Sequence, residues 1–148
     1  MKSSIIKFST YGILFGFISF LAGLYFDFTT NEVFGYATIV ASLLFVYFGI
    51  RHFRDKQNSG KLSFKKGMAI GLLISLFTAI GIGIADYLYT AIINPDFLDE
   101  YGKMMQAKDP SVEIMELTSG QAALFMLAIV FIIGLIITLI SSLILQRK

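Results

Sequence analysis

The chain has 148 residues, of which 56% are hydrophobic and only 15% are charged, and its formal net charge is +2. A soluble domain carries about a quarter charged residues, so this composition excludes an ordinary soluble protein. The sequence contains no cysteine and a single histidine, His52. Disulfide bonds, thiolate catalysis and cysteine-ligated metals are therefore excluded, and we expect no transition-metal site and no cofactor.

Four long segments contain no aspartate, glutamate, lysine, arginine or histidine: residues 8–26, 33–50, 67–85 and 122–145. An α-helix rises about 1.5 Å per residue, so about 20 residues cross the roughly 30 Å hydrocarbon core of a bilayer. The sequence therefore predicts an all-α membrane protein, a single integral domain (residues 1–148) in the lipid bilayer. Its four transmembrane helices are expected at about residues 8–26, 33–52, 65–89 and 120–145.

Small residues recur at helical spacing on the first and third predicted helices. On each helix they share one face: Gly12, Gly16, Ser19 and Gly23 on the first, and Gly67, Gly71, Ser75 and Thr78 on the third. Such faces let helix backbones approach closely in lipid, where packing drives association. We expect these faces to pack within the chain, and a seam between two copies in a homo-oligomer is the alternative. A short turn, residues 27–32, joins the first two helices.

The loop between the second and third helices, residues 53–64, belongs to a strongly basic stretch. Its charged residues are Arg51, Arg54, Asp55, Lys56, Lys61, Lys65 and Lys66. Short cytoplasmic loops carry the lysine and arginine excess of a membrane protein. On the opposite side of the four spans, the basic residues are Lys103 and Lys108 alone. We therefore expect the loop and both termini to be cytoplasmic.

This basic stretch has three interpretations. As an orientation signal it needs nothing more than its charge. As a contact for anionic lipid headgroups, each basic side chain would add about 1 kcal/mol. As a docking site for a membrane-protein partner it would need a defined geometry. Nucleic acid is not expected as a partner, because the net charge is small and the sequence shows no broad basic face. Ser63 is expected to cap the third helix.

Residues 90–119 form the one sizeable segment between predicted spans, on the extracytoplasmic side. Asn94-Pro95 predicts the N-cap and first residue of a helix, because the missing N–H of proline costs nothing there. Apolar residues then recur on one face: Phe97, Leu98, Tyr101, Met104 and Met105. Asp109-Pro110 predicts a second short amphipathic helix. We expect a helical cap on the outer leaflet or over the bundle, and a hairpin projecting from the third and fourth spans is the alternative.

Acidic residues near this cap form a candidate outer-face site: Asp86, Asp96, Asp99 and Glu100. Asp86 is the one ionisable residue inside a continuous apolar pattern, and membrane carboxylates often mark ion or proton paths. It lies about 28 Å along the helix from Gly67, so we interpret it as an interfacial carboxylate at the outer boundary. The other acids could bind a divalent cation, but no calcium-binding loop is present, and solvated helix faces are the interpretation we favour.

Part of the central stretch resembles the signature of a bacterial family. The matching positions are Gly49-Ile50-Arg51, Arg54-Asp55, Gly60, Ser63-Phe64, Gly67 and Gly71, followed later by Pro95-Asp96-Phe97. With the four-span layout, nearly the whole chain resembles domain-of-unknown-function family 4199. That family is known chiefly from Gram-negative bacteria of the Bacteroidetes type, which implies the inner membrane, and it has no established activity to carry over. An aspartate among these cations also suits an Arg51–Asp55 pair at i, i+4.

No serine–histidine–acid arrangement and no glycine-rich phosphate loop occurs in the sequence, so we expect no enzymatic activity. The favoured hypothesis is an inner-membrane accessory or scaffold protein that acts through a membrane-protein partner or a second copy of itself. The alternative is a small oligomeric channel or transporter for an ion or small solute, with Asp86 near its mouth.

Overall fold

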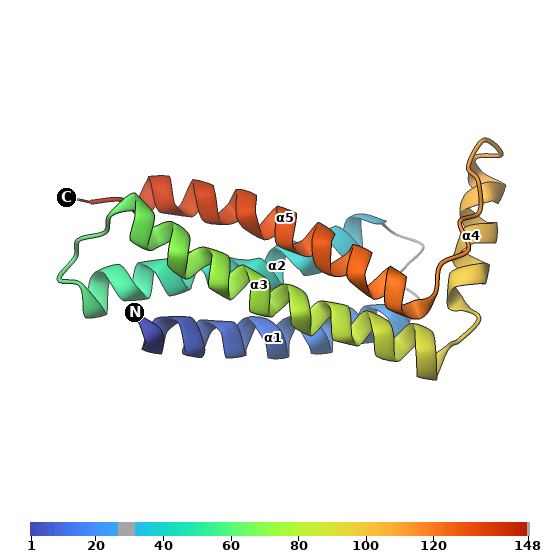
Figure 1. Ribbon diagram of the computed structural model, residues 1–148, viewed down its shortest axis with the longest axis horizontal. Helices are drawn as coiled ribbons and strands as arrows, with labels where there is room; N and C mark the ends of the chain where they lie inside the picture. The colour runs from blue at the N-terminus through green and yellow to red at the C-terminus, as the bar shows by residue number, and fades with distance from the viewer. Residues whose placement is uncertain (27–31, 148) are drawn as a thin grey trace.

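Four long helices lie side by side along one axis, and a short helix lies across one end of them (Figure 1). The long helices are α1 (Lys2–Tyr25), α2 (Glu32–His52), α3 (Phe64–Leu88) and α5 (Ser119–Leu145), and the short one is α4 (Phe97–Lys108). A π-helical turn prolongs two of them: η2 (Phe53–Gln57) follows α2, and η3 (Tyr89–Ile93) follows α3. The computed structural model describes residues 1–26 and 32–147, except for the side chain of Glu32.

Within the described residues, four helical stretches are long and apolar enough to cross a membrane: Lys2–Tyr25, Val33–Gln57, Phe64–Ile93 and Ser119–Leu145. The predicted all-α membrane protein, with four transmembrane helices and a short amphipathic helix before the last, is confirmed. The predicted turn at residues 27–32 falls outside the described residues, apart from the backbone of Glu32.

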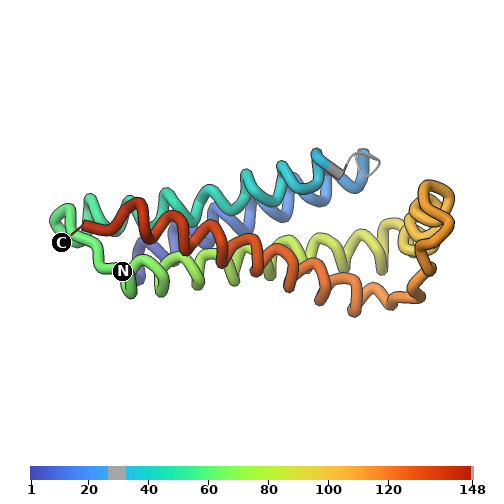
Figure 2. Tube along the Cα trace, turned by 90° about the horizontal axis from the view of Figure 1, so that it is seen from above, coloured from blue at the N-terminus to red at the C-terminus, as the bar shows by residue number. Residues whose placement is uncertain are grey.

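The two ends of the bundle differ (Figures 1 and 2). Both chain termini and the loop after η2 lie at one end, which we call the terminal end, and α4 lies at the other, which we call the cap end. At the terminal end α1 begins at Lys2, well before the expected start near residue 8. This polar first turn is held by tertiary contacts, because Ser4 is fully buried and its Oγ lies 3.0 Å from Nδ1 of His52.

The chain between α2 and α3 is fastened to the C-terminus. The amide of Leu62 donates to the carbonyl of Arg147 at 2.8 Å, and the amide of Arg147 donates back at 2.9 Å. Ser63 caps α3 as predicted, since its Oγ accepts from the amide of Lys66 at 3.4 Å. Gly60 turns the chain with a φ of +77°, a conformation that glycine adopts without steric cost. The terminal end is therefore closed by backbone hydrogen bonds.

Helix α3 is the centre of the bundle, because its small residues let the neighbouring helices approach. A Cβ atom at Gly12 of α1 would meet Thr78 of α3, and one at Gly71 of α3 would lie 2.5 Å from Cγ2 of Thr138 on α5. Ser75 of α3 forms a buried hydrogen bond with Thr138, with the two hydroxyl oxygens 3.2 Å apart. The prediction that these small faces pack within the chain is confirmed.

The start of α4 differs from the prediction at Asn94-Pro95. Helix α4 begins at Phe97, and its N-cap residue is Asp96 rather than Asn94. The amide of Phe97 donates to the carbonyl of Asn94 at 3.1 Å, so Asn94 to Phe97 form a turn before the helix. This turn redirects the chain, and α4 runs across the bundle instead of continuing α3 as a projecting hairpin (Figure 1).

The prediction of a second short helix after Asp109-Pro110 is wrong, because residues 112–118 are not helical. Oδ1 of Asp109 accepts from the hydroxyl and the amide of Ser111, at 2.6 and 3.0 Å, which closes a turn and holds the pKa of Asp109 below its ordinary value. The chain then returns along α4, with Ile114 beside Gly102. Seven helical residues would cover only about 10 Å, whereas seven extended ones cover about 23 Å, enough to return along α4, which is about 18 Å long.

Gly134 tests the close approach of α5 to α3, because a Cβ added there would lie 2.6 Å from Cβ of Ser75, an atom that cannot rotate away. We expect Gly134→Ala to lower the free energy of unfolding by about 1–3 kcal/mol, since the helices must move apart. Gly120 on the same helix has no atom within 4 Å of a Cβ. Gly120→Ala should raise the stability by up to about 1 kcal/mol. Denaturant titration in detergent micelles measures both, and equal effects would contradict the packing described.

Candidate functional site

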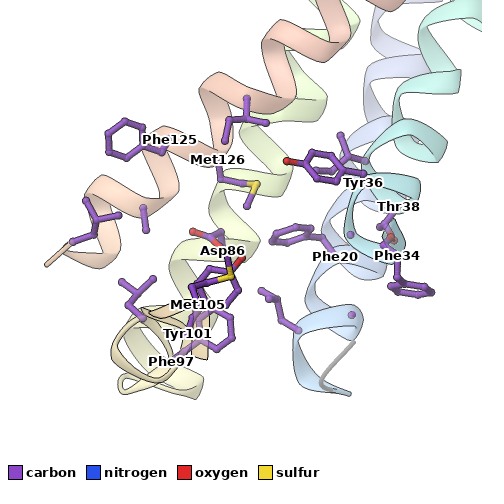
Figure 3. Close-up of a pocket in the computed structure, with 18 of the residues that line it drawn as sticks. Phe20, Phe34, Tyr36, Thr38, Asp86, Phe97, Tyr101, Met105, Phe125 and Met126 are labelled. Atoms are coloured by element: carbon purple, nitrogen blue, oxygen red, sulfur yellow. The ribbon is translucent and has the colours of Figure 1, made fainter. Parts of the chain in front are cut away.

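A cavity of about 650 Å³ lies inside the cap end of the bundle. Helices α2 and α5 lie close together at the terminal end and separate toward the cap end, as Figure 2 shows. The cavity fills the space between them, with α1 and α3 behind it and α4 across its end (Figure 3). We call this cavity the cap pocket.

The separation of α2 from α5 follows from where small residues occur. At mid-bundle, a Cβ on Gly134 of α5 would lie 3.2 Å from Leu43 of α2, so the two helices touch there. Nearer the cap, a Cβ on Gly83 of α3 would lie 3.3 Å from the carbonyl oxygen of Ala123. Helix α5 therefore stays on α3 while α2 diverges, and the larger side chains of Phe125 and Met126 line the resulting space.

Apolar side chains from α1, α2, α4 and α5 and from the chain before α5 line most of the cap pocket. The larger ones are Phe20, Leu24, Phe34, Tyr36, Ile39, Phe97, Leu98, Tyr101, Met105, Met115, Leu117, Phe125, Met126 and Ile129. In Figure 3, Phe20 and Tyr36 approach from the side of α1 and α2, Met126 faces them from α5, and Phe97, Tyr101 and Met105 close the end. The pocket therefore offers an aromatic and thioether surface that suits an apolar occupant.

Asp86 of α3 points into the cap pocket between these groups (Figure 3). The residue is only 5% exposed, and its Oδ2 has no hydrogen-bond partner among the described residues. The sequence pattern indicates an interfacial carboxylate at Asp86, but the structure buries it. The reason is that η3 continues the helix to Ile93, about 10 Å beyond Asp86, and α4 then folds over that end.

The hydroxyls of Ser19 and Thr38, which also line the pocket, have partners in their own helices. Ser19 Oγ donates to the carbonyl of Phe15 at 2.5 Å, and Thr38 Oγ1 donates to the carbonyl of Phe34 at 3.0 Å. Among the described residues that line the pocket there is no lysine, arginine or histidine. The carboxylate of Asp86 is therefore the charged group that an occupant would meet.

The other acids of the candidate outer-face site do not join Asp86. Asp96, Asp99 and Glu100 are exposed on and before the first turn of α4, and they do not line the cap pocket. Glu100 accepts a long hydrogen bond, 3.5 Å, from the side chain of Asn94. Within the described chain, no three histidine, cysteine, aspartate or glutamate side chains group in a way that could hold a metal ion.

The residues of the basic stretch, the candidate contacts for lipid or a partner, are spread over the terminal end. Arg51 Nε lies 3.5 Å from Oδ2 of Asp55, which confirms the predicted pair, and Arg54 Nε lies closer to the same carboxylate, at 2.6 Å. The four lysines are exposed: Lys56, Lys61, Lys65 and Lys66. Exposed ion pairs contribute little, about 0–1 kcal/mol. Nothing in the described geometry brings these residues together around a common ligand.

The sequence does not predict the cap pocket, but it does predict part of the pocket wall as an apolar helix face. The apolar face predicted for residues 97–105 supplies four lining residues: Phe97, Leu98, Tyr101 and Met105. This apolar face predicts that residues 97–105 lie on the outer leaflet or pack over the bundle. It did not show that the face lies over Asp86, because the turn at Asn94 sets the direction of α4.

Asp86 is expected to lower the stability of the empty protein, because its buried carboxylate lacks a partner among the described residues. We expect Asp86→Leu to raise the free energy of unfolding by about 1–3 kcal/mol in detergent without added ligand. Asp99 is a matched control, since it is exposed in the first turn of α4. Asp99→Leu should lower stability by less than about 1 kcal/mol, through loss of the helix-dipole interaction. Destabilisation by Asp86→Leu would show that the carboxylate has a structural partner.

Comparison with known proteins agrees with the resemblance seen in the sequence. No curated protein and no solved structure matches the chain. Residues 7–147, which cover nearly the whole chain, match the family described as "Protein of unknown function (DUF4199)". The chain therefore belongs to this family.

Proposed function

We propose that this protein is a non-enzymatic accessory protein of the bacterial inner membrane that holds an apolar molecule in its cap pocket. The observation that carries the proposal is the 650 Å³ cavity, whose aromatic and methionine walls come from α1 and α2 on one side and from α4 and α5 on the other. Sites for small molecules are typically concave, mostly apolar and about 300–1,000 Å³ in volume, with few polar groups. The cap pocket has this size and character.

The interior below the pocket is filled, which favours holding a molecule over conducting one. Leu43, Val46 and Ile74 are fully buried at mid-bundle, and Gly134 brings α5 against α2 at the same level. The pocket lining, by contrast, comes from the cap half alone. A channel or transporter made of several copies is the alternative hypothesis, and a pocket that is closed from below gives it no support.

An occupant would enter the pocket from the bilayer, between α2 and α5. Tyr36 of α2 and Phe125 of α5 line the pocket, and each is 55% exposed. The excess of lysine and arginine at the terminal end supports a cytoplasmic position for this end. In that orientation the cap pocket lies in the outer half of the membrane, where an apolar molecule is already concentrated by the lipid.

A photoreactive dodecanol that carries a diazirine on its chain tests this proposal in liposomes. We expect crosslinks to concentrate on the parts of α1, α2, α4 and α5 that surround the pocket, because the probe resides there longer than on the lipid-facing surface. Mass spectrometry of the crosslinked peptides locates the sites. Uniform labelling of all exposed helix faces would contradict the proposal.

A pair of tryptophan variants on α5 separates the pocket from the outer surface. Ala122 lines the cap pocket, whereas Leu124 is exposed and lies outside it. We expect Ala122→Trp to fill part of the cavity and to reduce pocket labelling several-fold, while Leu124→Trp should leave labelling close to that of the wild type. Because the chain has no tryptophan, the emission of each variant also shows whether the new ring is shielded from quenchers in the lipid.

A further inference from the structure

We infer that the cap pocket selects an organic cation: an apolar molecule whose protonated amine donates a hydrogen bond to the carboxylate of Asp86. This inference rests on the proposed function, because it names the class of molecule that the pocket holds. Its starting point is that Asp86 is only 5% exposed, faces the cavity, and leaves Oδ2 without a partner in the described structure.

The charge of the pocket favours a cation over a neutral or anionic molecule. A buried carboxylate is costly unless it is paired, and even an aspartate at the centre of a membrane helix, the most unfavourable depth, costs about 2.5–3.5 kcal/mol on insertion scales. No basic side chain lines the pocket in the described chain, and the hydroxyls of Ser19 and Thr38 are bonded to their own helices. An ammonium group from the ligand supplies the missing charge and donors, whereas an anion would be repelled.

The aromatic walls favour the same class of ligand. The faces of phenylalanine and tyrosine rings attract cations, and organic ammonium groups are often bound by several rings together. Figure 3 shows Phe20, Phe97 and Tyr101 around Asp86. The ring of Phe97 stacks on that of Tyr101, with centroids 5.9 Å apart, and meets Tyr89 edge-on at 5.2 Å, so these rings support one another's positions.

The single carboxylate excludes two other kinds of occupant. A calcium ion takes six to eight oxygen ligands, and the described lining offers one carboxylate in an apolar wall. A ligand with a phosphate near its amine would leave that phosphate without a basic partner among the described lining residues. An alkylammonium group is shared by free long-chain amines and by aminolipid headgroups, so the experiment must distinguish these two sources.

The test compares dodecylamine, dodecanol and dodecanoate as competitors of the photoreactive dodecanol in phosphatidylcholine liposomes. We expect dodecylamine to compete at a concentration at least about tenfold lower than dodecanol, the effect of one charge-assisted hydrogen bond, and dodecanoate to compete least. In Asp86→Asn, the preference for the amine over the alcohol should fall to near one. Asp99→Asn, which makes the same change on the exposed face of α4, should keep the preference.

The outcomes separate this inference from the proposed function. The inference is overturned if the probe labels the pocket but dodecylamine competes no better than dodecanol, or if Asp86→Asn keeps the preference for the amine. In either case the proposal that the pocket holds an apolar molecule is unaffected. If the probe never labels the pocket, the proposed function itself fails. Liposomes that contain phosphatidylethanolamine identify the source. Labelling that is lost only with dodecylamine supports a free amine, whereas loss of labelling in these liposomes overturns the exclusion of ligands that carry a phosphate beside the amine.

Discussion

The close contact between α3 and α5 determines where this bundle is filled and where it is open. Gly134 of α5 lies against Ser75, Gly71 of α3 lies against Thr138, and the two hydroxyls share a buried hydrogen bond. Lipid provides no hydrophobic drive for helices to associate, so close backbone packing of this kind holds them together. Because Gly83 keeps α5 on α3 up to the cap end, α5 moves away from α2 there. The cap pocket is the consequence of that divergence.

The position of Asp86 gives this cavity its chemistry. A carboxylate on the lipid-facing side of α3 would lower the stability of the protein. A carboxylate at the end of the helix would be hydrated and would cost little free energy. Here η3 prolongs the helix, α4 covers its end, and the side chain faces the cavity instead. A local conflict of this kind, a buried charge among aromatic and methionine side chains, is characteristic of functional sites, where stability is lower than the fold alone would allow.

The sequence predicted the membrane helices well because their signal is local. Length and the absence of charge determine a span, the small residues determine which faces approach, and the cap at Ser63 needs only its neighbours. The cap segment was predicted less well. The extended return of residues 112–118 depends on how far the chain must travel to reach α5, and the burial of Asp86 depends on the turn at Asn94. The periodicity of the residues predicts neither the path of a loop nor the face that the loop covers.

The helices that form the walls of the cap pocket differ in how many residues they bury, and this difference bears on how a bound molecule would be exchanged. Helix α3 buries a dozen residues, whereas α4 buries none and contacts the core mainly through the partly buried Phe97. Segments with few buried contacts open at lower free energy than the core does. The cap therefore contributes aromatic surface to the pocket without contributing much to the stability of the bundle. If the pocket holds an apolar molecule as proposed, opening of the cap would widen the entry between α2 and α5 while the α3–α5 contact and the hydrogen-bonded terminal end stay intact.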